Sequence, residues 1–195
     1  MADYEYGRIR RLDESLRAFG VAPDVAAEIL EGGEAVTRRT SPAAKADWMR
    51  EAMCKMDRLM DPESRQAVRE TCACCLGGKR LAITKAIARD NATLEERIAA
   101  CNDAPFVFGN SVALEGDGSV TVRFFADGEE SYRCACLPQA REALPITYCY
   151  CCGGHVKKHL QAALGRKLAV TVLETALSSA GKRPCTFSLR FADGG

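Results

Sequence analysis

The sequence predicts an α+β fold in which N-terminal helices are followed by an antiparallel sheet with one inserted helix. In the first hundred residues, apolar side chains recur every three or four positions, which is the period of a helix. From about Phe106 onward they alternate with a period of two, which is the period of a strand. We therefore expect a helical region over residues 1–104 packing on an α+β part over residues 105–195, or one continuous domain with this order of elements.

Turn and cap residues set the expected ends of the helices. Gly20 ends the first helix, Ser41 before a proline starts the third, and Asp61 before another proline ends it. Thr93, with a glutamate three positions later, has the pattern of a capping box. The predicted helices are residues 9–19, 23–32, 41–60, 79–89 and 93–101.

The second half alternates apolar and polar residues in short stretches separated by turn residues. The run Gly116–Gly118 predicts the turn of a first hairpin, and Asp127-Gly128 predicts a second turn. The last two strands are expected to form another hairpin around 178–184. The predicted elements are strands over 111–115, 119–126, 132–136, 167–175 and 185–191, with a helix over 153–164.

Composition narrows the class of protein. Eleven cysteines in 195 residues exceed average usage, yet the chain has neither a basic, apolar leader at its start nor an apolar run of membrane-spanning length. We therefore expect a cytoplasmic protein whose cysteines are free thiols, metal ligands or redox groups. The net charge of +1 favours neither nucleic-acid nor membrane partners.

Glu174 and Cys185 interrupt two otherwise apolar strand faces. Leu168, Val170 and Val172 precede Glu174 at a spacing of two, and Cys185 begins a strand whose face continues with phenylalanine and leucine. In a hairpin both residues would lie near its mouth and point inward. An uncompensated carboxylate there would cost several kcal/mol. A metal ion shared with a thiolate would compensate it.

Two cysteine clusters repeat one local pattern. Cys72, Cys74 and Cys75 match Cys149, Cys151 and Cys152 at a constant offset of 77, and in both copies two glycines and basic residues follow. Thiolates at a helix N-terminus are stabilised by the helix dipole and by nearby cations, which raises their affinity for metal. The two clusters are therefore candidate metal ligands, in one site or in two, although buried inert thiols are the alternative.

The remaining cysteines and the two histidines have weaker signals. Cys54 and Cys101 lie within helical patterns and are expected in the core, whereas Cys134-Ala-Cys136 suits a metal site or plain packing equally. His155 lies one helical turn from the second cluster and is a candidate metal ligand or catalytic proton donor. His159 is expected to be structural. The spacings of ferredoxin clusters, paired zinc fingers and HExxH metalloproteases do not occur.

A second group of candidates would bind a small ligand. Trp48 stands beside a methionine stripe, which is expected in the core but would also suit an adaptable pocket wall. Two cations at the start of a predicted helix would attract an anionic group. The ligand candidates are Trp48, Met49, Met53, Met56, Lys79 and Arg80.

Residues 105–192 resemble the end of a 4-vinyl-reductase-type (hydrocarbon-binding) domain. The resemblance is carried by Cys151 with Gly-Gly-His155, then Glu174 at a distance of 23 residues, then Cys185 another 11 residues on. It implies that these cysteines and Glu174 are three of four zinc ligands. The family has its remaining cysteine where this chain has Leu177.

That departure leaves the fourth zinc ligand open. Another thiol would have to complete the tetrahedral site, or the position would stay open to water or substrate, as in a catalytic zinc centre. The thiols considered for this role are Cys149, Cys152, Cys72, Cys74 and Cys75.

Three functions follow from this reading. The first is a zinc-binding module that holds a small organic ligand in an apolar pocket. The second is a zinc-dependent hydrolase or lyase of the same fold, acting on a small, sulfur-containing substrate with His155 as acid or base. The third is a thiol redox or metal-handling protein built on the two cysteine clusters. Related domains pair through their helices, so a homodimer is expected.

Overall fold

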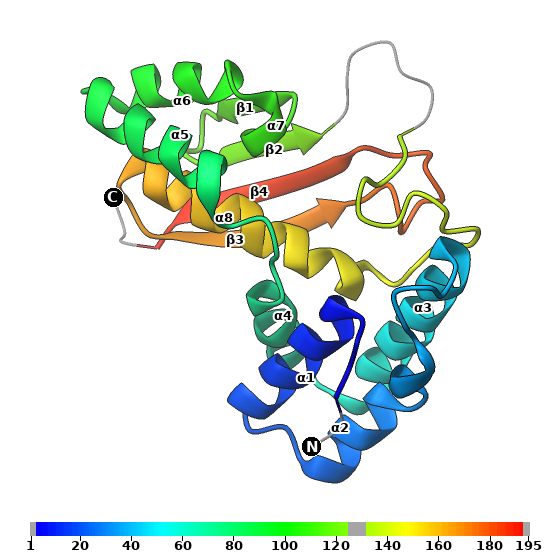
Figure 1. Ribbon diagram of the computed structural model, residues 1–195. Helices are drawn as coiled ribbons and strands as arrows, with labels where there is room; N and C mark the ends of the chain where they lie inside the picture. The colour runs from blue at the N-terminus through cyan, green and yellow to red at the C-terminus, as the bar shows by residue number, and fades with distance from the viewer. Residues whose placement is uncertain (1–2, 125–131, 193–195) are drawn as a thin grey trace.

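The structure is a computed structural model, described here for residues 3–124 and 132–192 (Figure 1). Within these residues the chain has eight α-helices and one four-stranded antiparallel sheet, which is the predicted α+β class. The helices are α1 (Gly7–Ala18), α2 (Pro23–Leu30), α3 (Pro42–Leu59), α4 (Pro62–Thr71), α5 (Gly78–Asp90), α6 (Leu94–Asn102), α7 (Pro105–Phe108) and α8 (Tyr150–Leu164). Two 3-10 turns are η1 (Gly33–Ala35) and η2 (Ile146–Cys149).

Local capping explains where several helices begin. The side chains of Ser41 and Asp61 accept hydrogen bonds from backbone N–H groups three residues later, and a proline follows each cap. Thr93 and Glu96 form the predicted capping box at the start of α6. Gly165, in a left-handed conformation, ends α8.

The sheet consists of β1 (Ser111–Leu114), β2 (Val120–Phe124), β3 (Leu168–Glu174) and β4 (Cys185–Phe191) in the order β1-β2-β4-β3. Both predicted hairpin partners pair as expected, β1 with β2 and β3 with β4. Helix α8 lies across one face of the sheet, and α5 and α6 lie beside it (Figure 1). Gly153 permits this contact, since an added Cβ would lie 3.2 Å from Val172.

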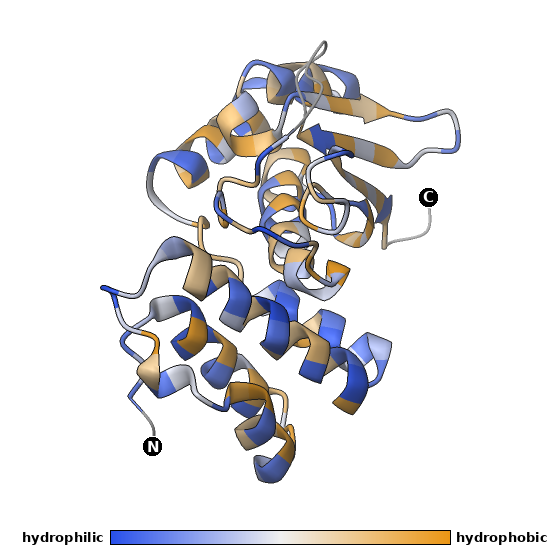
Figure 2. Cartoon of the chain, turned by 90° about the vertical axis from the view of Figure 1, so that its right-hand side faces the viewer, coloured by the Kyte–Doolittle hydropathy of each residue, from blue (hydrophilic) through white to orange (hydrophobic). Residues whose placement is uncertain are grey.

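The buried apolar residues form two clusters. The first joins α1 to α4 with the segment 137–149, and the second joins α5 to α8 with the sheet. The two clusters correspond to the lower and upper parts of Figure 1. Figure 2 shows hydrophilic and hydrophobic residues on different sides of the N-terminal helices, as expected for helices that bury one face. Because α5 and α6 belong to the second cluster, the boundary between the clusters lies before α5, upstream of residue 104.

Three expectations about local structure are wrong. Helix α4 was not expected after the break at Asp61, because its sequence is mostly polar, yet Asp61 and the following proline are themselves a helix start. Residues 132–136 are not a strand, because among the described residues they pair with no strand of the sheet. Helix α8 begins at Tyr150 instead of 153, so Cys151 and Cys152 lie inside its first turn.

The remaining expectations concern a turn, the end of a strand and the two lone cysteines. The predicted turn at 127–128 and the end of the strand over 119–126 lie outside the described residues. Of the lone cysteines expected in the core, Cys101 is fully buried, whereas Cys54 is exposed because it lies on the outer face of α3. In the described part of the chain, no helix has both the length and the apolarity needed to cross a membrane.

Candidate functional site

Four cysteines from three separate segments line one small cavity of about 20 Å³, which we call the thiol cavity. This volume holds a single water molecule or ion. Its thiols belong to Cys72, Cys74, Cys136 and Cys151, and its other walls are Arg8, Met49, Arg69 and Tyr148. The apolar walls of the thiol cavity belong to the first buried cluster, and Cys151, which packs against that cluster, comes from the first turn of α8.

The C-terminal end of α4 positions the first two thiols. Cys72 is the C-cap residue of α4, and its Sγ lies 3.4 Å from the carbonyl oxygen of Val68. Cys74 follows in the loop that leads to α5, and its side chain is exposed as well as lining the cavity. This loop is tied to α8, because the carbonyl oxygen of Cys75 lies 2.9 Å from Nε2 of His159.

The third thiol comes from the loop that precedes η2. Arg8 on α1 donates a hydrogen bond from Nη1 to the carbonyl oxygen of Cys136 and another to the Tyr148 hydroxyl at 3.2 Å. The thiol of Cys134 is hydrogen-bonded to that of Cys136. The two cysteines therefore share one contact, although they do not belong to a strand.

The fourth thiol lies in the first turn of α8. The preceding η2 turn buries Cys149 and Tyr148, which places Cys151 over the first cluster. The N-terminal end of a helix favours negative charge within its first turn. Cys151 is therefore the cavity thiol whose anionic form the backbone itself supports.

Two arginines give this cavity positive charge. Arg69 on α4 is only 3% exposed; its Nη2 donates to the carbonyl oxygen of Tyr148 at 3.0 Å. Within the described residues its Nε has no hydrogen-bond partner and the side chain forms no ion pair. Arg8 is the second cation, and none of the described side chains that line the cavity is a carboxylate. A buried charge without a partner costs several kcal/mol, so a negatively charged group in the cavity would stabilise the arginines.

Two of the cavity thiols, Cys136 and Cys151, do not supply that charge at neutral pH. Burial raises the pKa of Cys151 to about 11, although the nearby Arg69 acts in the opposite direction. The hydrogen bond with Cys134, and then burial, hold the pKa of Cys136 far above its ordinary value. Protonated thiols are poor nucleophiles. A bound cation would reverse this preference, because a metal deprotonates the thiols that coordinate it.

Glu174 does not face Cys185 as the simple alternation predicts. A register shift between Val172 and Glu174 inserts an extra residue in β3, so Glu174 pairs with Thr186 instead. The Thr186 hydroxyl donates to Oε1 of Glu174 at 3.0 Å. This hydrogen bond gives Oε1 of Glu174 a partner on the neighbouring strand. Burial raises the pKa of the Cys185 thiol, and the carboxylate still lies near enough to Cys185 to raise that pKa further.

A second group of thiols lies at the start of α8 and on β4, with Cys149 in the first cluster and Cys152 and Cys185 in the second. Cys149, Cys152 and Cys185 are near enough that each raises the pKa of a neighbour, although burial is the larger cause for all three. The N–H of Ala176 donates to Sγ of Cys185 at 3.3 Å. Burial raises the pKa of Cys149 to about 12.

The residues implied by the resemblance are thus divided between different surroundings. Cys151 lines the thiol cavity, Glu174 binds Thr186, and Cys185 belongs to the second thiol group. Over residues 3–124 and 132–192, no three histidine, cysteine, aspartate or glutamate side chains already have the arrangement of a metal site. Leu177, at the position of the missing cysteine, is buried in the first cluster.

The two histidines lie side by side on α8, with ring centroids 4.5 Å apart; His159 is fully buried and His155 is partly buried. Nε2 of His155 lies 3.0 Å from the carbonyl oxygen of Val107, and Nε2 of His159 lies 2.9 Å from the carbonyl oxygen of Cys75. Each Nδ1 is buried and has no partner among the described residues. Burial lowers the pKa of His155 to about 4, so this ring is neutral at pH 7.

The candidates for ligand binding lie in two places. Met49, Met53 and Met56 are fully buried, as expected for core, and of these only Met49 lines the thiol cavity. Trp48 donates from Nε1 to the carbonyl oxygen of Glu31 at 3.1 Å. Lys79 and Arg80 lie at the start of α5, near the exposed end of the cysteine loop.

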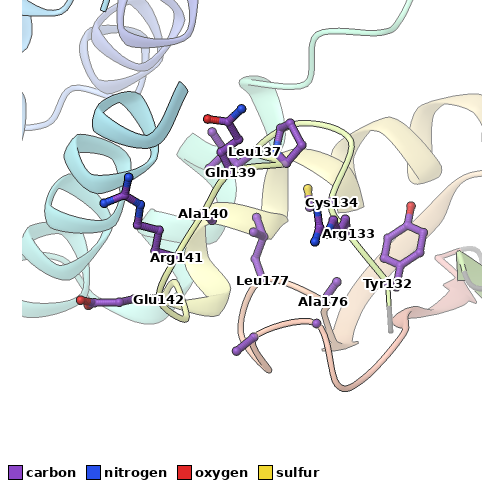
Figure 3. A pocket seen from close by; sticks show the side chains of 13 residues that line it. Tyr132, Arg133, Cys134, Leu137, Gln139, Ala140, Arg141, Glu142, Ala176 and Leu177 are labelled. Atoms are coloured by element: carbon purple, nitrogen blue, oxygen red, sulfur yellow. The ribbon is translucent and has the colours of Figure 1, made fainter. Parts of the chain in front are cut away.

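A larger pocket of about 530 Å³ opens beside the thiol cavity (Figure 3). Its walls are the segment 132–142 and the loop 176–181, with Leu137, Ala176 and Leu177 as apolar lining. Cys134 lines this pocket, and its hydrogen-bond partner Cys136 lines the thiol cavity. A pocket of this size suits a small organic molecule.

A family of unknown function, DUF6144, matches residues 12–189. The chain belongs to this family. The match covers the buried clusters except for Tyr4 and Ile9 of the first one, and it covers every residue of the thiol cavity except Arg8. No curated protein matches the chain.

The sequence did not single out Arg8, Arg69 or Tyr148. The usable signal was Arg69, which stands between Val68 and Cys72 on the apolar face of α4. An arginine on a buried helix face is uncommon unless its charge is compensated. The position of Arg69 on a buried face can be recognised only if Pro62–Thr71 is known to form a helix, and the sequence analysis did not predict that helix.

Proposed function

We propose that this protein is a zinc-binding module whose metal is held in the thiol cavity by Cys72, Cys74, Cys136 and Cys151. The observation that carries the proposal is the convergence of four thiols and two arginines, with no carboxylate among the described lining residues. Four cysteines are a standard ligand set for tetrahedral zinc. This set keeps Cys151 from the resemblance but replaces Glu174 and Cys185.

Charge supports zinc as the metal. Four thiolates around a divalent ion carry a net charge of −2, which Arg8 and Arg69 would neutralise. The Nε of Arg69 that has no partner among the described residues would then have an anionic sulfur to bind. Soft thiolate ligands also favour zinc over magnesium or calcium.

The position of the cavity suggests a structural role for the metal. The proposed ligands come from the end of α4, from the loop before η2 and from α8, so that one ion would tie these three segments together at the first buried cluster. The thiols would have to rotate inward on binding, since they are not yet arranged as a site. Binding energy gained in this way adds directly to folding stability.

A small-molecule function is a second proposal, favoured by the pocket of about 530 Å³ beside Cys134. This pocket takes the place of the methionine stripe as the proposed ligand-binding wall, because the methionines are buried in the core. The apolar lining from Leu137 and Leu177 and the exposed Arg133 and Arg141 suit a small organic acid. Titration of benzoate, followed by NMR shifts of the residues lining this pocket, tests the proposal; shifts confined to other residues would reject it.

Elemental analysis of protein purified without oxygen and without chelator tests the metal proposal. We expect about one zinc per chain, lost in Cys136→Ser and retained in Cys185→Ser. Cys54→Ser is the matched control, because Cys54 is exposed and does not line the cavity. Retention of zinc in Cys136→Ser together with its loss in Cys185→Ser would reject the cavity and favour the set implied by the resemblance.

A further inference from the structure

Two arginines line the thiol cavity, and their positive charges have no counter-charge in the described part of the chain. Arg69 is 3% exposed and Arg8 is partly buried, and neither forms an ion pair with a described residue. A buried ionised side chain without a partner of opposite charge costs several kcal/mol. The two arginines therefore favour an anion in the cavity that both of them line.

The guanidinium of Arg69 also has unused hydrogen-bond donors. A guanidinium carries N–H groups on each of its nitrogens. Within residues 3–124 and 132–192, the one hydrogen bond of Arg69 runs from Nη2 to the carbonyl oxygen of Tyr148, at 3.0 Å. Its Nε is buried and has no acceptor in the same residues. A buried donor without an acceptor is destabilising, because it has lost its hydrogen bond to water. An anion would supply the acceptor and the charge together.

The other polar groups of the wall are donors as well. Arg8 donates from Nη1 to the hydroxyl oxygen of Tyr148 at 3.2 Å, which leaves the proton of that hydroxyl free to be donated to a third group. Thiols are weak donors too. The remaining wall residue, Met49, is apolar. The cavity thus combines positive charge with donors, which is the surrounding that an anion requires.

The size of the cavity limits which anion could fit. Its volume of about 20 Å³ holds one water molecule or one monoatomic ion. Phosphate, sulfate and carboxylates have several heavy atoms each, so they would have to push side chains out of a close-packed wall. An anion also requires no new arrangement of the thiols, which among the described residues do not form a metal-binding group. Size therefore favours a monoatomic anion such as chloride.

We propose that the thiol cavity binds one chloride ion, held by Arg8, Arg69 and the hydroxyl of Tyr148. These residues belong to α1, α4 and η2, so the ion would tie three elements together. The inference does not rest on the proposed zinc, because it concerns the metal-free chain. A volume of one ion means that chloride and zinc exclude each other.

Thermal unfolding of the full chain in sodium chloride and in sodium gluconate, at equal ionic strength, tests the proposal. The chain is first dialysed against a chelator, and elemental analysis checks that it carries no zinc. Gluconate is far too large for the cavity, so it supplies ionic strength without filling the site. We expect the unfolding midpoint to rise by several degrees with increasing chloride and to rise much less with gluconate, because a ligand that binds only the folded chain stabilises it.

Two results of this experiment would overturn the chloride site. Equal midpoints in the two salts would leave water as the occupant of the cavity. A chain that unfolds when its zinc is removed would show that no anion holds the cavity together.

Variants locate the ion. Arg69→Met should abolish the difference between the two salts, whereas Arg89→Met should keep it, because Arg89 is exposed and paired with Asp90. Arg8→Met is the second test if the Arg69→Met chain does not fold, and it should reduce the difference as well. Broadening of the chloride NMR signal measures binding directly and should be lost in the same variants. A chloride effect that persists in both Arg69→Met and Arg8→Met would overturn the cavity as the binding site.

Reloading with zinc distinguishes the chloride site from the proposed metal site. If both exist, zinc-loaded protein should lose its chloride dependence, because thiolates on the metal would replace chloride as the counter-charge of the arginines. A chain that binds zinc as proposed but shows no chloride dependence when metal-free would overturn the chloride site alone. A chain that binds no zinc but is stabilised by chloride would overturn the metal site alone.

Discussion

Arg69 donates a hydrogen bond from Nη2 to the carbonyl oxygen of Tyr148 at 3.0 Å, which ties α4 to the segment leading into α8. The same contact holds the guanidinium at the thiol cavity, where burial lowers the pKa of Arg69 and the thiols of Cys72 and Cys151 act to raise it. A buried cation is stabilised by anionic sulfur and destabilised by neutral thiols. Arg69 therefore links the stability of the fold to the charge of the cavity.

We expect Arg69→Met to weaken zinc binding by about 10–100-fold, the usual effect of removing a residue that supports metal ligands. Competition with a chelator of known affinity measures this change. Arg89→Met is the matched control, because Arg89 is exposed and paired with Asp90. Equal zinc affinities in Arg69→Met and the parent would show that the guanidinium does not contribute to zinc binding.

Glu174 offers a direct distinction between the two proposed ligand sets. Glu174→Ala removes the hydrogen bond from Thr186, so we expect a loss of about 0.5–1.5 kcal/mol in the free energy of unfolding. Its zinc content should equal that of the parent. Urea unfolding and elemental analysis measure the two quantities, with Glu115→Ala in the exposed turn as the control. Loss of zinc from Glu174→Ala would support a metal at the sheet instead.

The buried His155 predicts a pH dependence of stability. Burial lowers its pKa to about 4, below the ordinary value of 6.5, so the folded chain binds fewer protons than the unfolded chain between these pH values. The contribution of neutral His155 is therefore fully present above about pH 6.5 and is lost as pH falls toward 4, with a total on the order of 3 kcal/mol. Metal-free protein should be used, since bound thiolates also take up protons.

The comparison between the parent and His155→Gln isolates this histidine. The glutamine amide can still donate to Val107 but carries no titratable group, so its unfolding free energy should fall less between pH 7 and about pH 5. Urea unfolding across this range measures both chains. Parallel pH profiles would mean that other groups cause the acid sensitivity.

Gly154 marks the closest approach of α8 to α4. A Cβ at this position would lie 2.1 Å from the carbonyl oxygen of Glu70, which is backbone and cannot rotate away. We expect Gly154→Ala to lower the free energy of unfolding by about 1–3 kcal/mol or more, despite the higher helix propensity of alanine. Thermal unfolding measures the effect. Gly116→Ala, where an added Cβ meets nothing within 4 Å, should remain close to the parent in stability.

Local patterns were sufficient for most of the fold. The alternation over Leu168–Glu174 and Cys185–Phe191 predicted β3 and β4 within one residue, because a half-buried strand must place every second side chain on the core. Helix α4 was not predicted, because few of its residues are apolar and because its N-cap residue, Asp61, was interpreted as the end of the preceding helix. The strand expected over 132–136 failed because alternation alone does not supply a pairing partner.

The candidate site was predictable only in part. The sequence marked Cys72, Cys74 and Cys151 as chemically important, since clustered thiols are uncommon as packing. It placed Glu174 beside Cys185, because the spacing of side chains along paired strands assumes a regular ladder. The register shift after Val172 turned Glu174 to Thr186 instead. A single inserted residue reverses the direction of the side chains that follow it in a strand. No local pattern in this sequence predicts the insertion after Val172.

By itself the sequence determined the α+β class, the order of most elements and the abundance of thiols, because periodicity, caps and composition act over a few neighbouring residues. Tertiary structure alone decided which thiols meet. Cys72, Cys136 and Cys151 come from distant segments, and the packing of α4 against α8 and of α1 against α4 brings them to one cavity with Arg8 and Arg69. Such contacts depend on how whole helices pack, which is a property of the assembled core and not of any one segment.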